Sequence, residues 1–335
     1  MVRSLYGGGM TASPSEPQIA RFRADLQAIG GPRDDGRLGL AVSGGPDSLA
    51  LLLLTHAAFP GRVAAATVDH GLRPEATAEA DQVHAICGAL GVPHEILRIR
   101  VEPGTQGIQA AARKGRYAAL IDWCRAGGMA SLLTAHHRDD QAETVLMRLA
   151  RGAGIAGLAG IRPRRALAGD PAGIIALRPL LGWSKEELIG LVAAAGLKAA
   201  DDPSNRDLRY DRTRARHLLR SADWLDPRRL AAVADHARDA EDALDWAARQ
   251  AFETRCTVKG DALLLDASGL PREIRRRLLK MAFRLGFPES GELRGPELDR
   301  LMIRLDSGLV STLSGVKIEP GAPWRLRNAP PHHGK

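Results

Sequence analysis

The chain is poor in cysteine, with three in 335 residues. Cys87, Cys124 and Cys256 lie far apart and form no C-x-x-C pair, which argues against a disulfide framework and against a thiolate metal site. No apolar run approaches the ~20 residues that a membrane span needs, and the first residues lack the apolar core of a signal peptide. We therefore expect a cytoplasmic protein.

The charge balance is basic. Lys and Arg number 47 against 39 Asp and Glu, a net charge of +8. Such a surplus is typical of proteins that bind polyanions such as nucleic acid, and also of an ordinary basic surface; composition leaves both open.

The length and the hydrophobic pattern predict two domains. Residues 1–17 are expected to be a disordered tail, within which Met10 is a second possible start. Short apolar runs alternate with helical patterns and predict an α/β domain over residues 18–224, with a Rossmann-like parallel sheet and helices on both faces. Beyond a boundary near Leu225, residues 225–335 are expected to form a smaller, mainly helical domain. The expected strands are 38–42, 62–68, 94–99 and 131–135; the later helices are 230–255, 270–285 and 296–305, followed by a possible hairpin over 309–319.

A glycine-rich loop, residues 43–48, follows the first expected strand and precedes an apolar helix. Gly44 and Gly45 allow the backbone to approach a ligand, and Pro46 suits a first helical turn. A helix N-terminus of this kind attracts phosphate, although a tight structural turn is the alternative. The loop has no Walker A lysine and no G-x-G-x-x-G spacing. Its sequence, S-G-G-P-D-S, resembles the PP-loop of ATP pyrophosphatases.

Two further patterns lie near the ends of later strands, where ligands bind in such folds. Asp140 and Glu143 are three residues apart on an expected helix and share one face. Two carboxylates beside a polyphosphate require a metal or a cationic substrate, whereas a solvated acidic helix start is the alternative. Arg113 lies on an expected helix whose basic face would by itself be solvated, whereas beside a nucleotide site it could pair with phosphate or carboxylate.

A basic segment over residues 206–220 closes the first domain. With a helix starting near Tyr210, Arg212, Arg216 and Arg220 stack on one face at intervals of four. This segment suits RNA phosphates. Residues 272–284 are also basic, but their apolar face fits an ordinary amphipathic helix equally well.

Taken together, residues 43–48, 68–76, 107–117, 136–160 and 202–219 resemble the tRNA(Ile)-lysidine synthetases, in the same order and at similar distances. The resemblance implies a PP-loop ATPase fold and a ligase that uses ATP and Mg²⁺. Members adenylate the C2 oxygen of the cytidine at the first anticodon position of an isoleucine tRNA, releasing pyrophosphate. Free lysine then displaces AMP through its amine and gives lysidine. The helical segment after Asp226 resembles the first C-terminal domain of the family, so residues 225–335 are expected to bind tRNA. The larger second C-terminal domain of long members is expected to be missing or reduced to the hairpin, and a homodimer is reasonable by the same resemblance.

The resemblance also implies roles for matching positions. ATP would be held by Ser43, Gly44, Gly45, Pro46, Asp47 and Ser48, with Asp47 on the magnesium side. Lysine would bind to Asp140 and Glu143. Arg113 would meet the lysine carboxylate or the reacting centre, and His136 would lie near the nucleotide. The tRNA contacts would be Asn205, Arg212, Arg216 and Arg220.

Three alternatives remain. A tRNA thiolase of the same fold needs cysteines that carry sulfur or hold an iron–sulfur cluster, and these three are not arranged for that. An amidotransferase needs an ammonia source, for which no glutaminase-length segment is left over. An RNA-binding protein with an inactive nucleotide site is the third, against which the intact Ser43, Asp47 and Ser48 argue.

Overall fold

The structure is a computed structural model that describes residues 12–32, 36–71, 75–101, 108–167, 173–200, 209, 211–291, 293 and 295–330. The chain divides into two compact units, Met1–His236 and Ala237–Lys335. The division falls inside helix α9 (Pro227–Arg255), whereas the sequence places a boundary near Leu225, before that helix.

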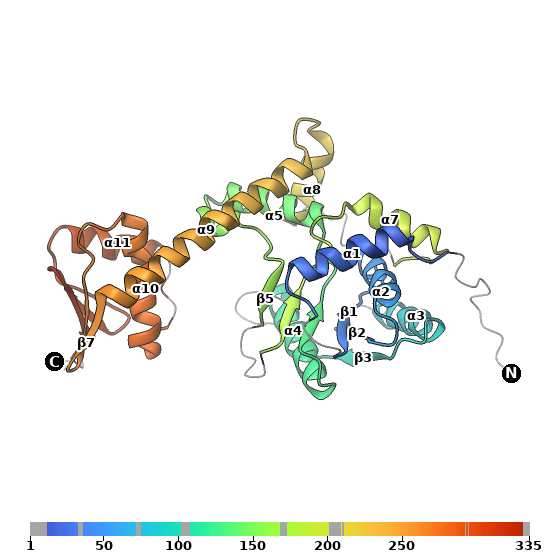
Figure 1. Ribbon diagram of the computed structural model, residues 1–335, viewed down its shortest axis with the longest axis horizontal. Coiled ribbons are helices and arrows are strands. Elements are labelled where there is room, and N and C mark those ends of the chain that lie inside the picture. The colour runs from blue at the N-terminus through green and yellow to red at the C-terminus, as the bar shows by residue number, and fades with distance from the viewer. Residues whose placement is uncertain are drawn as a thin grey trace. The chain divides into compact units, whose positions relative to one another are not determined.

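The first unit is built on a six-stranded sheet with the order β3-β2-β1-β4-β6-β5 (Figure 1). Five strands are parallel and β5 is antiparallel at the edge. The four expected strands are confirmed, and the edge pair β5–β6, made of three-residue strands, was not expected. The strands are β1 (Leu38–Ala41), β2 (Val63–Asp69), β3 (His94–Arg98), β4 (Ser131–Leu133), β5 (Arg164–Ala166) and β6 (Ile175–Leu177).

Helices cover both faces of this sheet. One core packs α1, α2, α3 and α7 against one face, and a second core places α4 against the other. The alternating side chains of β1 divide between them, because Leu40 joins the first core while Gly39 lies against Trp123 and Cys124 of α4. The helices are α1 (Glu16–Ala28), α2 (Pro46–Ala58), α3 (Glu75–Ala89), α4 (Ile108–Ala126), α5 (Arg138–Ala150), α6 (Ile155–Leu158), α7 (Lys185–Ala194) and α8 (Asp211–Ser221).

The second unit combines helices with a small antiparallel sheet. Its strand order is β7-β8-β11-β10-β9, and the expected hairpin is present as β9 paired with β10. Leu278 and Phe283 of α10 and Met302 of α11 are buried in one core with the sheet residue Leu326. The elements are β7 (Cys256–Lys259), β8 (Ala262–Leu265), α10 (Arg272–Gly286), a 3-10 turn (Pro288–Ser290), α11 (Gly295–Asp306), β9 (Ser311–Leu313), β10 (Val316–Glu319) and β11 (Trp324–Asn328).

Among the helices of the described residues, none is both long enough and apolar enough to cross a membrane.

Candidate functional site

The glycine loop, residues 43–48, connects β1 to α2 as expected. Gly44 has a φ of +85°, a conformation that glycine adopts without strain, and Gly45 is the residue before the first turn of α2. The Ser48 hydroxyl donates to the Gly45 carbonyl at 2.9 Å and accepts from the Ser43 amide at 3.1 Å. Because the first amides of a helix have no partner within it, this folded loop presents donors where an anion can bind.

Asp47 lies in the first turn of α2 and faces His137. Its Oδ2 is 3.4 Å from Nε2 of His137. Its Oδ1 is buried and has no hydrogen-bond partner among the described residues. A buried carboxylate oxygen without a partner is costly, which makes Oδ1 available to a cation or another donor.

His137 joins the glycine loop to α5. Its side chain is 1% exposed, and Nε2 is 3.5 Å from Asp140 while Nδ1 is 3.6 Å from Asp139. Its amide donates to Asp140, so that it caps the start of α5. Burial alone would lower the pKa of His137, but the carboxylates of Asp139, Asp47 and Asp140 outweigh burial and raise the pKa to about 9. His137 is therefore a cation at neutral pH.

Asp140 and Glu143 are brought together on one face of α5, as their spacing predicts, and both bind arginines of α8. Arg212 donates to Asp140 at 2.7 Å and to Glu143 at 2.8 Å. Arg216 donates to Glu143 at 2.8 Å. Burial opposes ionisation of Asp140, yet the charges of His137 and Arg212 lower its pKa. The carboxylates expected to bind lysine are thus paired with arginines expected to bind tRNA.

His136 lies beside this cluster, not within it. Its Nδ1 is 3.0 Å from the Thr134 hydroxyl. Burial lowers its pKa to about 4, which makes it neutral at physiological pH. The charge of Asp140 opposes this shift, while those of Arg178, Arg212 and Arg113 contribute to it.

Of the remaining predicted site residues, Arg113 and Arg220 are exposed on the surface. Arg113 is exposed on α4, with its guanidinium 5.1 Å from the centre of the Tyr117 ring. Arg220 is exposed on α8. Asn205 lies outside the described residues.

Sequence reasoning assigned the histidine role to His136 and gave none to His137 or Asp139. The position of His137 immediately before an acidic helix start, with Asp140 three residues later, is the pattern that could have revealed a cap. No local sequence pattern predicts its contact with Asp47, which lies ninety positions away in the chain.

The basic segment of α10 is largely engaged in ion pairs within the second unit. Arg277 donates to Glu241 at 2.7 Å, and Arg275 pairs with Asp306. This arrangement favours the amphipathic-helix interpretation for these two arginines.

All three cysteines are free thiols. None is in a disulfide, and Cys87 and Cys124 are buried in different cores. Burial raises the pKa of Cys87 to about 12, which makes it a poor nucleophile. The described residues contain no group of three or more His, Cys, Asp or Glu side chains that could hold a metal.

Comparisons with known proteins agree with this geometry. Residues 16–222 match a family model described as a PP-loop domain. The chain is 42% identical to a tRNA(Ile)-lysidine synthase of Zymomonas mobilis, over 94% of this chain and 95% of that one. It is 45% identical to a tRNA(Ile)-lysidine synthase of Novosphingobium aromaticivorans, over 93% and 94%. Among solved structures, the U34-tRNA thiolase NcsA of Methanococcus maripaludis with its [4Fe-4S] cluster aligns with a TM-score of 0.54 at 17% identity, over 67% of this chain and 78% of that one. At that identity, the likeness extends to the fold alone.

Proposed function

The chain belongs to the tRNA(Ile)-lysidine synthase family, and we propose that it ligates free lysine to C2 of the wobble cytidine of an isoleucine tRNA at the expense of ATP. Adenylation of the C2 oxygen releases pyrophosphate and makes that oxygen part of a good leaving group. The lysine amine then attacks C2, and AMP departs. The observation that carries this proposal is the contact between Asp47 and His137, which places a PP-loop beside an acidic helix start.

ATP binds through the glycine loop in this proposal. The amides of the first turn of α2 and the hydroxyls of Ser43 and Ser48 face the phosphates. The raised pKa makes His137 cationic, and its Nε2 is 3.4 Å from Asp47 of the same loop. The PP-loop domain implies ATP use in itself.

Magnesium fits Asp47. A carboxylate oxygen is the ligand that Mg²⁺ prefers, and Oδ1 of Asp47 is buried without a partner among the described residues. When bound with ATP, the ion would neutralise phosphate charge.

Lysine binds at Asp140 and Glu143 in this proposal. Glu143 is 2% exposed and accepts from two arginines, so the cluster already binds cationic donors. A lysine ammonium must lose a proton before its amine attacks, and in this proposal Asp140 or Glu143 orients the amine and accepts that proton. Arg113 would meet the lysine carboxylate.

The tRNA is proposed to contact Asn205, Arg212, Arg216 and Arg220. Arg220 is exposed and available to phosphate, whereas Arg212 and Arg216 would have to leave Glu143 or bridge it to RNA. Isoleucine tRNA as substrate follows from the family. The homodimer and the cytoplasmic location stay predictions.

Exchange of labelled pyrophosphate into ATP tests the first half-reaction. We expect exchange that requires isoleucine tRNA and no lysine, because adenylation precedes attack by the amine. Asp47→Asn should abolish it, while Asp211→Asn, at an exposed carboxylate of α8, should keep it. ATP hydrolysis that needs neither tRNA nor lysine would contradict the proposal.

A further inference from the structure

A chain of hydrogen bonds in the first unit connects helix α3 to the glycine loop, and the proposed reaction uses none of its side chains. At its outer end, Nδ1 of His84 in α3 is 3.2 Å from Nδ1 of His94 at the start of β3. Nε2 of His94 is 2.8 Å from the hydroxyl of Thr67 in β2. That hydroxyl donates to the carbonyl of Val42 at 2.7 Å. Because Val42 immediately precedes the glycine loop, the chain ends at the peptide bond that opens the loop.

The register of the sheet brings these side chains together. His94 is the partner of Ala65 in the parallel pair of β2 and β3, and Thr67 lies two residues beyond Ala65 on the same face. Ala65 belongs to the core that contains Val83 of α3. His84, the next residue of that helix, therefore reaches His94 from the helix that covers this face.

The chemistry of these groups fixes the direction of the chain. A hydroxyl has one proton and a carbonyl can only accept, so Thr67 donates to Val42 and accepts from Nε2 of His94. In the neutral ring the other nitrogen is an acceptor, which makes Nδ1 of His84 the donor to Nδ1 of His94. Burial, together with the charge of His84, lowers the pKa of His94 to about 4 and keeps its ring neutral at physiological pH.

Both polar groups of the Val42–Ser43 peptide are held. Its carbonyl accepts from Thr67, and its amide donates to the Ser48 hydroxyl at 3.1 Å. Among the described residues no backbone amide donates to this carbonyl, so loss of the Thr67 hydroxyl would leave a buried acceptor without a partner. Because a peptide unit is planar, a rotation of the carbonyl also turns the amide away from Ser48. Ser48 in turn donates to the Gly45 carbonyl at 2.9 Å, so the rotation would disturb the loop itself.

We propose that Thr67 and His94 are positioning residues for ATP, which act through the Val42–Ser43 peptide and hold the amides and hydroxyls of the glycine loop in the arrangement that binds the triphosphate. A loop that is already ordered loses less conformational freedom when its ligand binds, so the chain raises the affinity for ATP without contacting it. His84 is exposed, so water can replace it as the donor to His94 and its contribution is smaller. The inference rests on the proposed function only for the binding of ATP to this loop.

Calorimetric titration of the full chain with Mg²⁺ and α,β-methylene-ATP, whose α–β bridge cannot be hydrolysed, tests the proposal without tRNA or lysine. We expect Thr67→Val, which keeps the shape and removes the hydroxyl, to raise the Kd for this analogue about three- to tenfold, as for one hydrogen bond. Thr67→Ser keeps the donor and should retain the wild-type Kd. His94→Leu should raise the Kd as Thr67→Val does, whereas His94→Gln keeps an N–H donor and should stay within about twofold of wild type.

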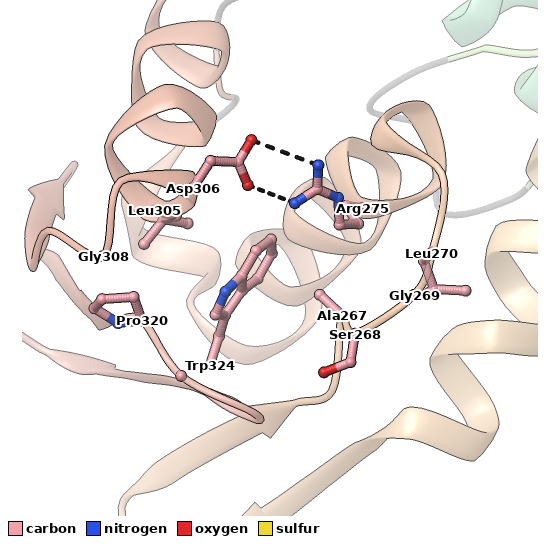
Figure 2. Close-up of a pocket in the computed structure, with 11 residues that line it drawn as sticks. Ala267, Ser268, Gly269, Leu270, Arg275, Leu305, Asp306, Gly308, Pro320 and Trp324 are labelled. Carbon is pink, nitrogen blue, oxygen red and sulfur yellow. Dashed lines mark hydrogen bonds and ion pairs between the residues drawn. The ribbon is translucent and has the colours of Figure 1, made fainter.

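Two controls separate this effect from a general loss of stability. Thr55→Val removes another buried hydroxyl, which donates to the Leu51 carbonyl at 2.7 Å within α2. Asp306→Asn weakens the ion pair with Arg275 in the second unit (Figure 2). Both variants should leave the Kd for the analogue unchanged, and urea denaturation of every variant measures the stability that each one loses.

Steady-state kinetics give the second readout. In Thr67→Val the KM for ATP should rise with the Kd, whereas the KM for lysine and the kcat at saturating ATP should stay within about twofold of wild type. An unchanged Kd in Thr67→Val and His94→Leu overturns the proposal, as does an equal rise in Thr55→Val. Wild type that binds the analogue and forms no lysidine would contradict the proposed function instead, and the titration would still decide the role of Thr67.

Discussion

Arg212 of α8 donates from Nε to Oε2 of Glu143 in α5 at 2.8 Å, which joins a side chain proposed to contact tRNA to one proposed to hold lysine. Glu143 also accepts from Arg216 at 2.8 Å and is 2% exposed. A buried carboxylate is stable only when it is paired, so these arginines neutralise Glu143 in the free chain. A bound lysine ammonium would have to share or replace this pairing.

The pairing predicts a stability difference between neighbouring arginines of α8. Arg216→Ala should lower the free energy of unfolding by about 1–3 kcal/mol, because it removes one partner of a buried carboxylate. Arg214→Ala should change it by less than about 0.5 kcal/mol, because Arg214 is 71% exposed and lies 3.9 Å from Asp211. Urea denaturation of both variants measures the difference, and equal losses would refute the role of Glu143 pairing.

Glu143→Gln should weaken the binding of lysine and leave the binding of ATP unchanged. The variant keeps the shape and a hydrogen-bond acceptor but removes the charge that would attract an ammonium. We expect the KM for lysine to rise by roughly 10- to 100-fold, as for loss of a charge-assisted hydrogen bond, with the KM for ATP within about twofold. Steady-state kinetics with each substrate varied in turn gives both values. A rise in the KM for ATP alone would place Glu143 at the nucleotide instead.

His137 predicts how stability depends on pH. Its folded-state pKa of about 9 lies above the ordinary value of 6.5, because nearby carboxylates outweigh burial. The stabilisation is therefore complete below about pH 6.5 and is lost as the pH rises through about 9. We expect wild type to lose on the order of 2 kcal/mol relative to His137→Gln across this interval.

Denaturation midpoints measured from pH 6 to 10 test this expectation. His217→Gln is the control, since His217 is exposed on α8, and its pH profile should follow wild type. A His137→Gln profile parallel to wild type would show that folding does not raise the pKa of His137.

Asp139 predicts a pH dependence of stability opposite to that of His137: its contribution is lost as the pH falls. Burial opposes its ionisation, but His137 and the Lys185 amide lower its pKa to about 2. Its contribution is present above the ordinary value of about 3.9 and is lost as the pH falls toward 2. Asp139→Asn should therefore be less stable than wild type above pH 4, and this difference in the free energy of unfolding should shrink as the pH falls from 4 to 2 in the same denaturation measurements. A deficit that stays constant over this range would contradict the assignment.

Much of the first unit could be predicted from sequence because its elements are local patterns. Apolar runs such as 38–42 identify strands, and the structure contains β1 there. The edge strands β5 and β6 were not predicted: β5 is the polar segment Arg164–Ala166, and β6 is a single three-residue segment, Ile175–Leu177.

Some features of the candidate site could be predicted from the sequence and others could not. The glycine loop and the shared face of Asp140 and Glu143 follow from spacing within one element. The contacts of Glu143 with Arg212 and of Asp47 with His137 depend on tertiary packing between segments far apart in the chain. Sequence spacing contains no information on such pairs.

The central claim is that the glycine loop activates a cytidine for attack by lysine. Nucleoside analysis of isoleucine tRNA, after incubation with the protein, ATP and labelled lysine, tests it most directly. We predict a lysine-adducted cytidine that forms only with ATP and disappears in Asp47→Asn. Formation of the same product by Asp47→Asn, or its absence with wild type while ATP is still consumed, would contradict the account.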